Sequence, residues 1–439
     1  MKGFKETEIG LIPEDWEIHS LGKLSEIKTG QSAPQGKFYF QNGKYPFIRV
    51  SHLDSHTFAI KGCDLVNEKA IKDFKLRLFP KGTIVFPKSG ASIFLEKRAM
   101  LPFDAYIVSH LCAINVKKAE LINQRFLFYT LINSKLARRK RTNYPTLNLS
   151  EIKALKIPLP PIEEQKAIAK VLDSVRETIE KTENVIKALK EFKKSLMEHL
   201  FTYGAVPYDE RDRVELRQTE IGLIPKHWEV KKFGSLYEIQ QGKALSRKNT
   251  EGTLCPFLRT SNIGWGKIIF PIESKMPFTE KEMEKLKLKH GDLLICEGGE
   301  VGRTAIWKYD SQQIFFQNHI FRARAISKTD IYSQFHMYWI QYAILLKRLY
   351  VGYENKTTIP NLSRRRLSSF LIPVPPIEEQ KEIAEILDKV DSRIEAEERK
   401  KEALEELFKT LLNKLMTGKI RVAEEFLNEF KETAETENG

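Results

Sequence analysis

The stretch that decides the architecture is IPLPPIEEQK at residues 157–166, because it returns as IPVPPIEEQK at residues 372–381. A second stretch is repeated as well: TEIGLIP at residues 7–13 recurs unchanged at residues 219–225, and a Trp-Glu pair follows each copy. Between these markers the two copies agree only in outline. Repetition of this kind indicates that one structural unit occurs twice along the chain. We therefore predict two diverged globular pieces, each framed by nearly identical ends.

Each globular piece mixes strand-like and helical segments. Short apolar runs such as residues 83–86 and 292–295 are bounded by glycine-containing turns, which is typical of strands. A helical stretch stands near the end of each piece, at residues 124–136 and 334–346. We therefore predict an α+β fold for both pieces.

A long helix is predicted to follow each Pro-Pro pair. Pro161 and Pro376 suit the first helical turn, where no N–H is needed, and the following Glu pairs complement the positive end of the helix dipole. Apolar residues then recur with a mean spacing of about 3.5, which is typical of a coiled-coil seam. Gly204 and Gly418 are placed to end the two helices. We expect the helices to pair with each other as an antiparallel coiled coil.

The polar positions of this seam leave the pairing open. Thr182, Glu397 and Lys401 fall near the middle of an antiparallel pair, but a parallel pair also brings Thr182 close to Glu397. The antiparallel choice therefore rests mainly on chain geometry. The alternative is that each helix packs only onto its own globular domain, with Lys193, Glu397 and Lys401 solvated.

The composition favours a polyanionic partner. The chain has 439 residues, and 72 Lys and Arg against 58 Asp and Glu give a formal net charge of +14. Nucleic acid is favoured over an anionic membrane surface, because the most apolar window, residues 337–346, is too short to span a bilayer. The first residues lack the apolar core of a signal peptide, so we expect a cytoplasmic protein. The four scattered cysteines are expected to be reduced core thiols.

The arrangement of these parts resembles the specificity subunit of type I restriction-modification systems. The resemblance covers nearly the whole chain and rests on two elements that occur in both copies, Glu-Ile-Gly-x-Ile-Pro-x-x-Trp and Ile-Pro-x-Pro-Pro-x-Glu-Glu-Gln-x-x-Ile-Ala. In that family each variable domain is a target recognition domain that reads one half of a bipartite double-stranded DNA sequence. The helices form a rigid spacer that docks two modification (methyltransferase) subunits. Chemistry that uses S-adenosylmethionine, ATP and Mg²⁺ belongs to the partner subunits, so the resemblance implies no cofactor or metal here.

The resemblance also gives expected boundaries. Residues 1–156 and 205–371 are the two target recognition domains, residues 157–204 and 372–420 are the two spacer helices, and residues 421–439 are an acidic tail. Because the two domains have diverged, their half-sites should differ. A helix of about 42 residues is about 63 Å long, which limits the unread gap to less than two turns of DNA.

The residues agree with a non-catalytic subunit. Adenine methyltransferases place Asp, Asn or Ser before a Pro-Pro pair and an aromatic residue after it, to hold a flipped base. Here Leu159 and Val374 precede the pairs, and Ile162 and Ile377 follow them. No Walker-type phosphate loop is present, and the glycine-rich residues 298–302 are interpreted as a tight turn.

Polar loops at matching places in the two copies are the candidates for DNA contact, because Arg and Lys bind guanine edges and phosphates while Asn and Gln bind adenine edges. The candidates in the first copy are Thr29, Gln31, Ser32, Arg49, Ser51, His52, Lys88, Ser89 and Arg98. Those in the second copy are Gln241, Lys243, Arg247, Lys248, Arg259, Ser261, Asn262 and Arg303, with Glu297 nearby. For any one of them, a solvated surface side chain is an equal alternative.

Two basic runs near the ends of the variable domains are candidates for phosphate contact. They contain Arg138, Arg139 and Arg141 in the first copy and Arg364, Arg365 and Arg366 in the second. A solubilising surface is the other interpretation. Trp16 and Trp228 are predicted to be core anchors, and the equivalent His110 and His319 are predicted to make core or loop hydrogen bonds in preference to binding a metal.

Two rival functions remain open from the sequence. The chain could be a self-contained DNA methyltransferase or nuclease, or a coiled-coil scaffold with no nucleic-acid role. Catalysis by the purified chain alone would identify the first, and weak DNA binding that hardly changes with salt would identify the second. The bases read, the gap length and the presence of restriction (endonuclease and translocase) subunits are not decided by the sequence.

Overall fold

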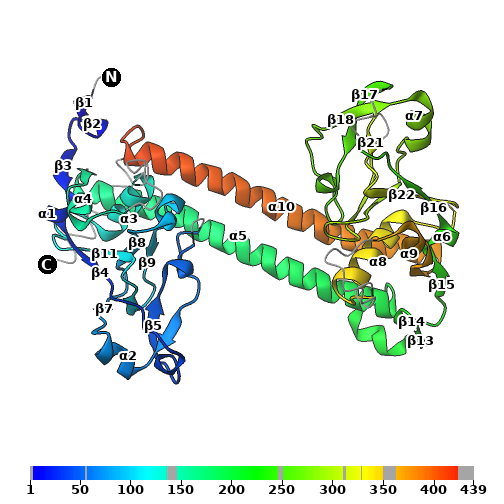
Figure 1. Ribbon diagram of the computed structural model, residues 1–439, viewed down its shortest axis with the longest axis horizontal. Coiled ribbons are helices and arrows are strands. Elements are labelled where there is room, and N and C mark those ends of the chain that lie inside the picture. Colours follow the sequence, from blue (N-terminus) through cyan, green and yellow to red (C-terminus); the bar gives the residue numbers. More distant parts are fainter. Residues whose placement is uncertain are drawn as a thin grey trace. The chain divides into compact units, whose positions relative to one another are not determined.

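The computed structural model describes residues 3–54, 57–134, 136, 146–245, 251–309, 313–327, 329–349 and 362–423. It is a mixed α and β structure, as predicted, and it divides into two compact units (Figure 1). Unit 1 comprises Met1–Glu183 and Lys400–Gly439, and unit 2 comprises Asn184–Arg399. Each unit contains one globular domain together with a part of each long helix.

The globular domain of unit 1 is built from two antiparallel pairs of strands and two four-stranded sheets. β1 (Phe4–Thr7) pairs with β2 (Gly10–Pro13), and β3 (Glu17–Ser20) pairs with β12 (Lys156–Leu159). The central antiparallel sheet has the order β4 (Ser25–Thr29), β11 (Leu111–Val116), β8 (Ile84–Pro87), β9 (Ala99–Met100). The distal sheet has the order β6 (Asp64–Val66), β5 (Tyr45–Ile48), β10 (Ala105–Ile107), β7 (Leu78–Phe79). Its helices are α1 (Leu21–Leu24), α2 (Glu68–Asp73), α3 (Gln124–Asn133) and α4 (Leu149–Lys153).

Unit 2 repeats this plan, with one strand fewer in its distal sheet. β13 (Leu216–Thr219) pairs with β14 (Gly222–Pro225), and β15 (Glu229–Lys232) pairs with β23 (Leu371–Val374). The central sheet has the order β16 (Tyr237–Gln241), β22 (Ile320–Ala325), β19 (Leu293–Cys296), β20 (Thr304–Ile306), and the distal sheet has the order β18 (Lys275–Phe278), β17 (Thr253–Leu258), β21 (Phe315–Phe316). The helices are α6 (Phe233–Leu236), α7 (Glu280–Leu286), α8 (Ser333–Leu345) and α9 (Arg364–Ser369). The predicted strands and helices correspond to β8, β19, α3 and α8.

The central sheet of each unit separates two hydrophobic cores. In unit 1, Ile84 and Phe86 of β8 join the core that contains Trp16, whereas Val85 joins the core beneath the distal sheet. Alternate residues of β19 divide between two cores of unit 2 in the same way. Burial on both faces explains why these strands are continuously apolar in the sequence.

Two long helices pass through both units. α5 (Ile162–Tyr203) follows the first Pro-Pro pair and α10 (Ile377–Met416) follows the second (Figure 1). In unit 2, Lys190 pairs with Glu398 at 2.6 Å and Lys193 with Asp391 at 2.7 Å, so residue numbers rise along α5 as they fall along α10. The predicted antiparallel pairing is therefore confirmed for these paired segments.

The C-terminal part of each long helix packs into the core of the other copy's globular domain. In unit 1, Phe408 of α10 joins the core and its ring lies 6.1 Å from that of Tyr129. In unit 2, Phe201 of α5 joins the core and lies 5.3 Å from Trp339. The alternative in which each helix packs only onto its own globular domain is therefore wrong.

The ends and polar positions of the helices follow from local chemistry. Gly204 follows the last residue of α5 and Gly418 lies two residues after the last residue of α10, with positive φ angles of 85° and 65°, so both end the helices as predicted. Lys193 is buried and bonds Asp391 and Gln341, so it is not a solvated seam residue. Lys401 pairs with Glu183 across unit 1.

Two expectations from composition can be compared with the described residues. None of the described helices is both long and apolar enough to cross a membrane. All four cysteines are free thiols; Cys112, Cys255 and Cys296 are buried and Cys63 is half-buried. Burial raises the pKa of the Cys112 thiol to about 12 and that of Cys296 to about 11, which makes both inert as nucleophiles.

Candidate nucleic-acid interface

The repeated ends of each copy contact each other. Trp16, which is fully buried, donates its Nε1–H to Glu164 Oε2 at 3.2 Å, and Trp228 donates to Glu379 Oε2 at 3.1 Å. The prediction that both tryptophans anchor the core is confirmed. The second glutamate of each Glu-Glu pair is present in both copies because it accepts a hydrogen bond from the tryptophan near the start of that copy.

The glutamine of the repeated motif holds three backbone groups. Gln165 donates to Leu121 O at 2.9 Å and to Pro160 O at 2.8 Å, and its Oε1 accepts from Asn123 N–H at 2.9 Å. Gln380 makes the equivalent three bonds in unit 2. Buried backbone groups need such partners. The repeated ends therefore attach each long helix to its domain, and the variable residues between them remain for recognition.

In unit 1, the loops that follow β4, β5, β8 and β10 are joined by backbone hydrogen bonds. Ser109 N–H donates to Gln31 O at 2.7 Å, and Lys88 N–H donates to His110 O at 2.9 Å. A further bond joins Val108 to the end of β5. We call residues 29–32, 49–52, 88–90 and 108–110 the first loop junction.

Unit 2 contains the same junction. Asn318 N–H donates to Lys243 O at 2.8 Å, and Glu297 N–H donates to His319 O at 2.9 Å. Gln317 is bonded to the end of β17. We call residues 241–243, 259–262, 297–299 and 317–319 the second loop junction. Loops that are distant in the sequence therefore meet at equivalent places in the two units.

A glycine makes each junction possible. A Cβ on Gly30 would lie 2.0 Å from Ile107 O, and a Cβ on Gly242 would lie 2.3 Å from Gln317 O. Both glycines sit where one loop crosses the backbone of another. This close approach explains why the glycine is retained in both copies.

The turns that begin at Arg49 and Arg259 are held by their own last residue. Arg49 N–H donates to His52 Nδ1 at 3.0 Å, and Arg259 N–H donates to Asn262 Oδ1 at 3.0 Å. The Arg259 side chain is exposed, whereas that of Arg49 is half-buried and forms an ion pair with Asp64. Thus His52 and Asn262 shape the turns from which the arginines project.

Two predicted contacts are withdrawn from the surface and are corrected here. The Arg98 side chain is 2% exposed and bonds Lys97 O and Glu96, and its burial lowers its pKa. The Lys243 side chain is 8% exposed and forms an ion pair with Glu282. Each of these cations is buried and paired with a half-buried carboxylate, so neither stands free at the surface as the sequence predicts.

The other predicted loop residues are accessible to different degrees. Thr29, Gln31, His52, Lys88, Ser89, Gln241, Asn262 and Arg303 are half-buried, and Ser32, Ser51, Arg259 and Ser261 are exposed. Arg303 also donates to Thr260 O at 3.0 Å. Arg138, Arg139, Arg141, Arg247 and Lys248 lie outside the described residues.

Of the two kinds of hydrogen bond that the sequence predicts for His110 and His319, core or loop, both histidines make the loop kind. His110 Nδ1 lies 2.7 Å from Ser89 Oγ, and His319 Nδ1 lies 3.1 Å from Glu297 Oε2. Both imidazoles are exposed at the junctions, a position that the sequence did not predict for them. The one signal in the sequence that could have placed them there is that they occupy equivalent positions in the two copies. Within the described ranges, no group of three or more His, Cys, Asp or Glu side chains is arranged to hold a metal ion.

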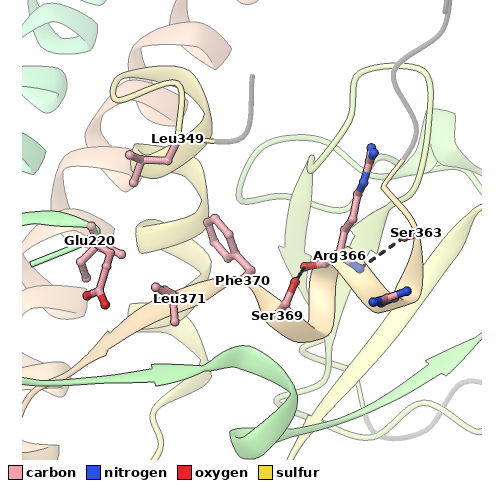
Figure 2. Close-up of a pocket in the computed structure, with 9 residues that line it drawn as sticks. Glu220, Leu349, Ser363, Arg366, Ser369, Phe370 and Leu371 are labelled. Atoms are coloured by element: carbon pink, nitrogen blue, oxygen red, sulfur yellow. Dashed lines mark hydrogen bonds between the residues drawn. The ribbon is translucent and has the colours of Figure 1, made fainter. Parts of the chain in front are cut away.

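The second arginine run lies on α9, next to the second loop junction. Leu362 N–H donates to Glu297 O at 2.8 Å, and Ser363 Oγ caps the helix by accepting from Arg366 N–H at 3.3 Å. Arg364, Arg365 and Arg366 are all exposed. Arg365 and Arg366 line a cavity of about 550 Å³, shown in Figure 2.

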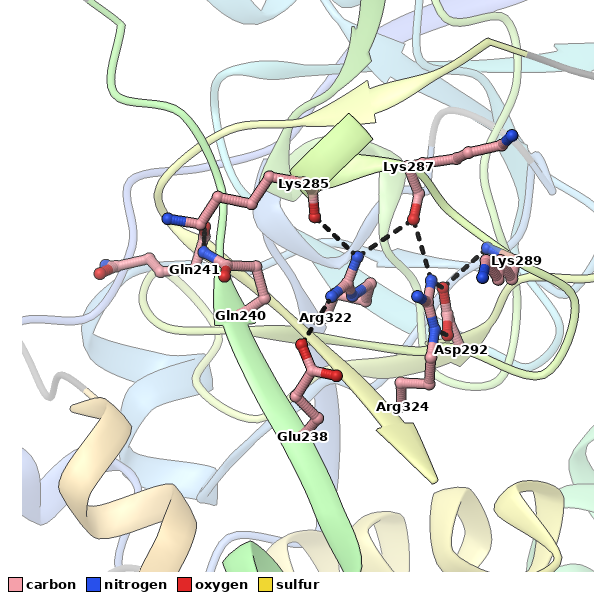
Figure 3. A network of polar contacts seen from close by, with 9 residues as sticks. All are labelled: Glu238, Gln240, Gln241, Lys285, Lys287, Lys289, Asp292, Arg322 and Arg324. Carbon is pink, nitrogen blue, oxygen red and sulfur yellow. Dashed lines mark hydrogen bonds and ion pairs between the residues drawn. The ribbon is translucent and has the colours of Figure 1, made fainter. Parts of the chain in front are cut away.

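The buried Arg322 and the half-buried Arg324 fix the backbone after α7 (Figure 3). Arg322 donates to Lys285 O at 3.0 Å and to Lys287 O at 3.1 Å, and Arg324 binds Asp292 through two nitrogens at 2.7 and 2.8 Å. Burial lowers the pKa of Arg322, whereas the hydrogen bonds to Asp292 raise the pKa of Arg324. The two arginines therefore hold the backbone of Lys285 and Lys287 in place.

The repeated architecture and paired junctions define the class of protein, and sequence comparison agrees with them. Residues 13–191 and 225–406 match the model of the type I restriction modification DNA specificity domain, so the chain belongs to that family. It is a DNA target-specificity subunit with two target recognition domains, the non-catalytic component of type I restriction-modification enzymes. The rival functions, a self-contained enzyme or a scaffold without a DNA role, are therefore set aside.

Individual relatives resemble the chain over most of its length. It is 30% identical to the type I restriction enzyme MjaVIII specificity subunit of Methanocaldococcus jannaschii, covering 96% of both chains. It is 23% identical to the type I restriction enzyme EcoKI specificity subunit of Escherichia coli, covering 85% of this chain and 82% of that protein. The type I restriction-modification S subunit from M. genitalium has a similar fold, with a TM-score of 0.56 and 17% identity over 91% of this chain and 96% of that one.

Proposed function

We propose that each loop junction reads one half of an asymmetric, bipartite target in double-stranded DNA. The observation that carries this proposal is that one junction occurs twice with different side chains at equivalent backbone positions. Lys88 N–H and Glu297 N–H make the same bond, as do Ser109 N–H and Asn318 N–H. A lysine binds acceptors on a base edge, whereas a glutamate accepts from a cytosine amine, so the two half-sites differ.

The proposed reading residues are the accessible ones among those predicted. In unit 1 they are Thr29, Gln31, Ser32, Arg49, Ser51, His52, Lys88 and Ser89, with His110 added. In unit 2 they are Gln241, Arg259, Ser261, Asn262 and Arg303, with Glu297, Asn318 and His319 added. Arg364, Arg365 and Arg366 are proposed to contact phosphate beside the second junction. Arg138, Arg139, Arg141, Arg247 and Lys248 stay predictions.

The long helices are proposed to set the gap between the half-sites and to dock two modification subunits. Phe192 on α5 and Leu407 on α10 occupy equivalent positions of the repeated helices, and their side chains are 54% and 44% exposed. Each is followed three residues later by an exposed hydroxyl, Ser195 or Thr410. One such apolar position lies in each unit, which favours two copies of the same partner.

The remaining parts of the proposal follow from the family. Residues 1–156 and 205–371 are the recognition domains, residues 157–204 and 372–420 the spacer helices, and residues 421–439 an acidic tail that lies mostly outside the described residues. S-adenosylmethionine, ATP and Mg²⁺ act in the modification subunits and in any restriction subunits that join, and the complex acts in the cytoplasm.

Mapping of methylated adenines tests the proposal directly. DNA from a host that carries this chain with its modification subunits should show two unequal half-sites separated by an unread gap of fixed length, below two turns of DNA. A single continuous or palindromic target would contradict two independent readers. The same host carrying the modification subunits without this chain is the control, and it should show no such pattern.

A further inference from the structure

Both recognition domains carry exposed cations at the same places around one short helix. Lys69, Lys75 and Arg77 stand two, eight and ten residues after Asn67, the N-cap of α2. Lys281, Lys287 and Lys289 stand at the same distances from Thr279, the N-cap of α7. We call these sets the first and second basic strips. All six side chains are exposed, and none of them forms an ion pair with a described residue.

Alternation along the chain directs the last two cations of each strip outward. Leu76 stands between Lys75 and Arg77 and is buried in the distal core of unit 1. Leu288 stands between Lys287 and Lys289 and is buried in the distal core of unit 2. In the second strip this segment is extended, so burial of Leu288 places Lys287 and Lys289 in solvent. In the first strip Lys75 has a left-handed φ of 50° at the turn after α2, and both Lys75 and Arg77 are exposed on either side of the buried leucine.

The first strip is attached to the first loop junction. Arg77 N–H donates to Gln31 Oε1 at 2.9 Å. The carboxylates of α2 are engaged elsewhere: Glu68 accepts from Tyr45 at 3.2 Å and Asp73 accepts from Tyr39 at 2.9 Å. The cations of this strip therefore lie beside the proposed reading loops, while the nearby acids are held by tyrosine hydroxyls.

The second strip is held by Arg322 and Asp292 and by the second junction. Arg322 fixes the carbonyl of Lys287, and Asp292 accepts from Lys289 N–H at 2.7 Å (Figure 3). Lys243 of the second junction forms its ion pair with Glu282 of α7. The backbone of this strip is thus fixed next to the junction, and Figure 3 shows the Lys287 side chain extending away from the network.

We propose that the two basic strips bind the DNA phosphates that flank the bases read by each junction. This inference rests on the proposed function. Phosphate contacts position a protein on DNA without carrying sequence information. Two domains that read different bases can therefore keep the same cations at the same places while their reading residues diverge. That pattern, with divergent junctions and retained strips, is the one the two units have.

The experiment measures DNA binding by the complex of the full chain with its modification subunits, as a function of salt. The test variants are K69A/K75A/R77A and K281A/K287A/K289A. The matched control is K23A/K117A/K118A, which removes three exposed lysines at the opposite end of the same central sheet, where Lys117 N–H bonds Leu24 O at 2.9 Å. Two duplexes of equal length are used, one with the mapped target and one with its bases shuffled.

Each strip variant should weaken binding to both duplexes and leave the ratio of the two affinities unchanged. The slope of log affinity against log salt should become shallower by about 0.9 for each phosphate that the variant no longer neutralises, or roughly 2 to 3 for a whole strip. The control should keep the parent slope. Thermal unfolding of each variant checks that the exposed substitutions leave the fold intact.

Two other outcomes would overturn the inference, and they are distinguishable. If the parent complex prefers its target but the strip variants keep the parent slope, the strips do not contact phosphate and the proposed function stands. If the parent complex shows no preference between the duplexes and no steep salt dependence, the proposed function fails together with the inference.

Discussion

At the scale of single residues, identity and divergence between the two copies separate structural tasks from recognition. Trp16, Glu164 and Gln165 have identical counterparts, and the tryptophan–glutamate bond and the three glutamine bonds are the same in both units. Lys88 and Glu297, by contrast, share a backbone hydrogen bond pattern and differ in charge. Within one chain, the repeated side chains are therefore those that the fold needs.

Replacing the motif glutamine tests this separation. Q165L keeps the size of the side chain but leaves two carbonyls and one N–H without partners, and each such group costs about 1 to 3 kcal/mol. We expect a decrease of at least about 3 kcal/mol in the free energy of unfolding of unit 1, measured by denaturant titration. The control is Q35L, at an exposed glutamine, which should change stability by less than about 0.5 kcal/mol. Equal effects of the two substitutions would contradict the structural role of the motif.

A buried histidine predicts the pH dependence of unit 2. His336 Nδ1 lies 2.8 Å from the Tyr237 hydroxyl and Nε2 lies 3.1 Å from Pro373 O, and burial lowers its pKa from 6.5 to about 4. The His336 imidazole therefore stays neutral in the folded state, whereas in the unfolded state it binds a proton below pH 6.5. Stability from this residue is present above pH 6.5 and falls as the pH drops toward 4, by about 3 kcal/mol in total.

Hydrogen exchange of the α8 and β22 amides measures this effect locally. H336Q should be less stable than the parent near pH 7, and the difference between the two should shrink by about 2 to 3 kcal/mol as the pH approaches 4. A difference that stays constant across this range would show that His336 does not carry the pH dependence. The exposed His110→Gln is the matched control and should show no such change.

At the scale of helices and strands, the sequence was sufficient to predict the features that depend on a local pattern of residues. The proline, glutamate and glycine positions predicted the start and end of α5 and α10, and the apolar spacing predicted their pairing. It was insufficient where an interaction joins distant segments or depends on burial. Arg98 and Lys243 look like surface cations in the sequence, because no local pattern shows that the fold leaves their side chains only 2% and 8% exposed. The apolar spacing of the helices likewise does not show that Phe408 packs into the core of unit 1 and Phe201 into that of unit 2.

The exposed apolar positions of the long helices predict the partner stoichiometry. F192E and L407E each place a charge in one proposed docking surface, and burial of a large apolar side chain is worth about 1.5 to 3 kcal/mol. We expect each single variant to bind one modification subunit at least about tenfold more weakly, and the double variant to lose both. Native mass spectrometry of the assembled complex measures the number of modification subunits bound to each variant. K181E on α5 is the control, and a double variant that keeps both partners would contradict the docking proposal.

At the scale of the whole molecule, the two copies form two similar reading units from one duplicated plan. Each unit is completed by the end of the helix that begins in the other copy, as Phe408 and Phe201 show. The excess of positive charge is distributed in the same repeated manner, with equivalent basic strips beside equivalent junctions. The half-sites are therefore expected to change independently when the side chains of one junction are changed.

The most direct test of this account is methylation mapping with one junction altered. The variant R49A/K88A/S89A removes reading side chains from the first junction alone, and the host, partners and mapping are the same as for the parent chain. The account predicts that one half-site becomes degenerate, while the other half-site and the gap length stay unchanged. Relaxation of both half-sites together, or an unchanged target, would contradict the claim that each junction reads its own half.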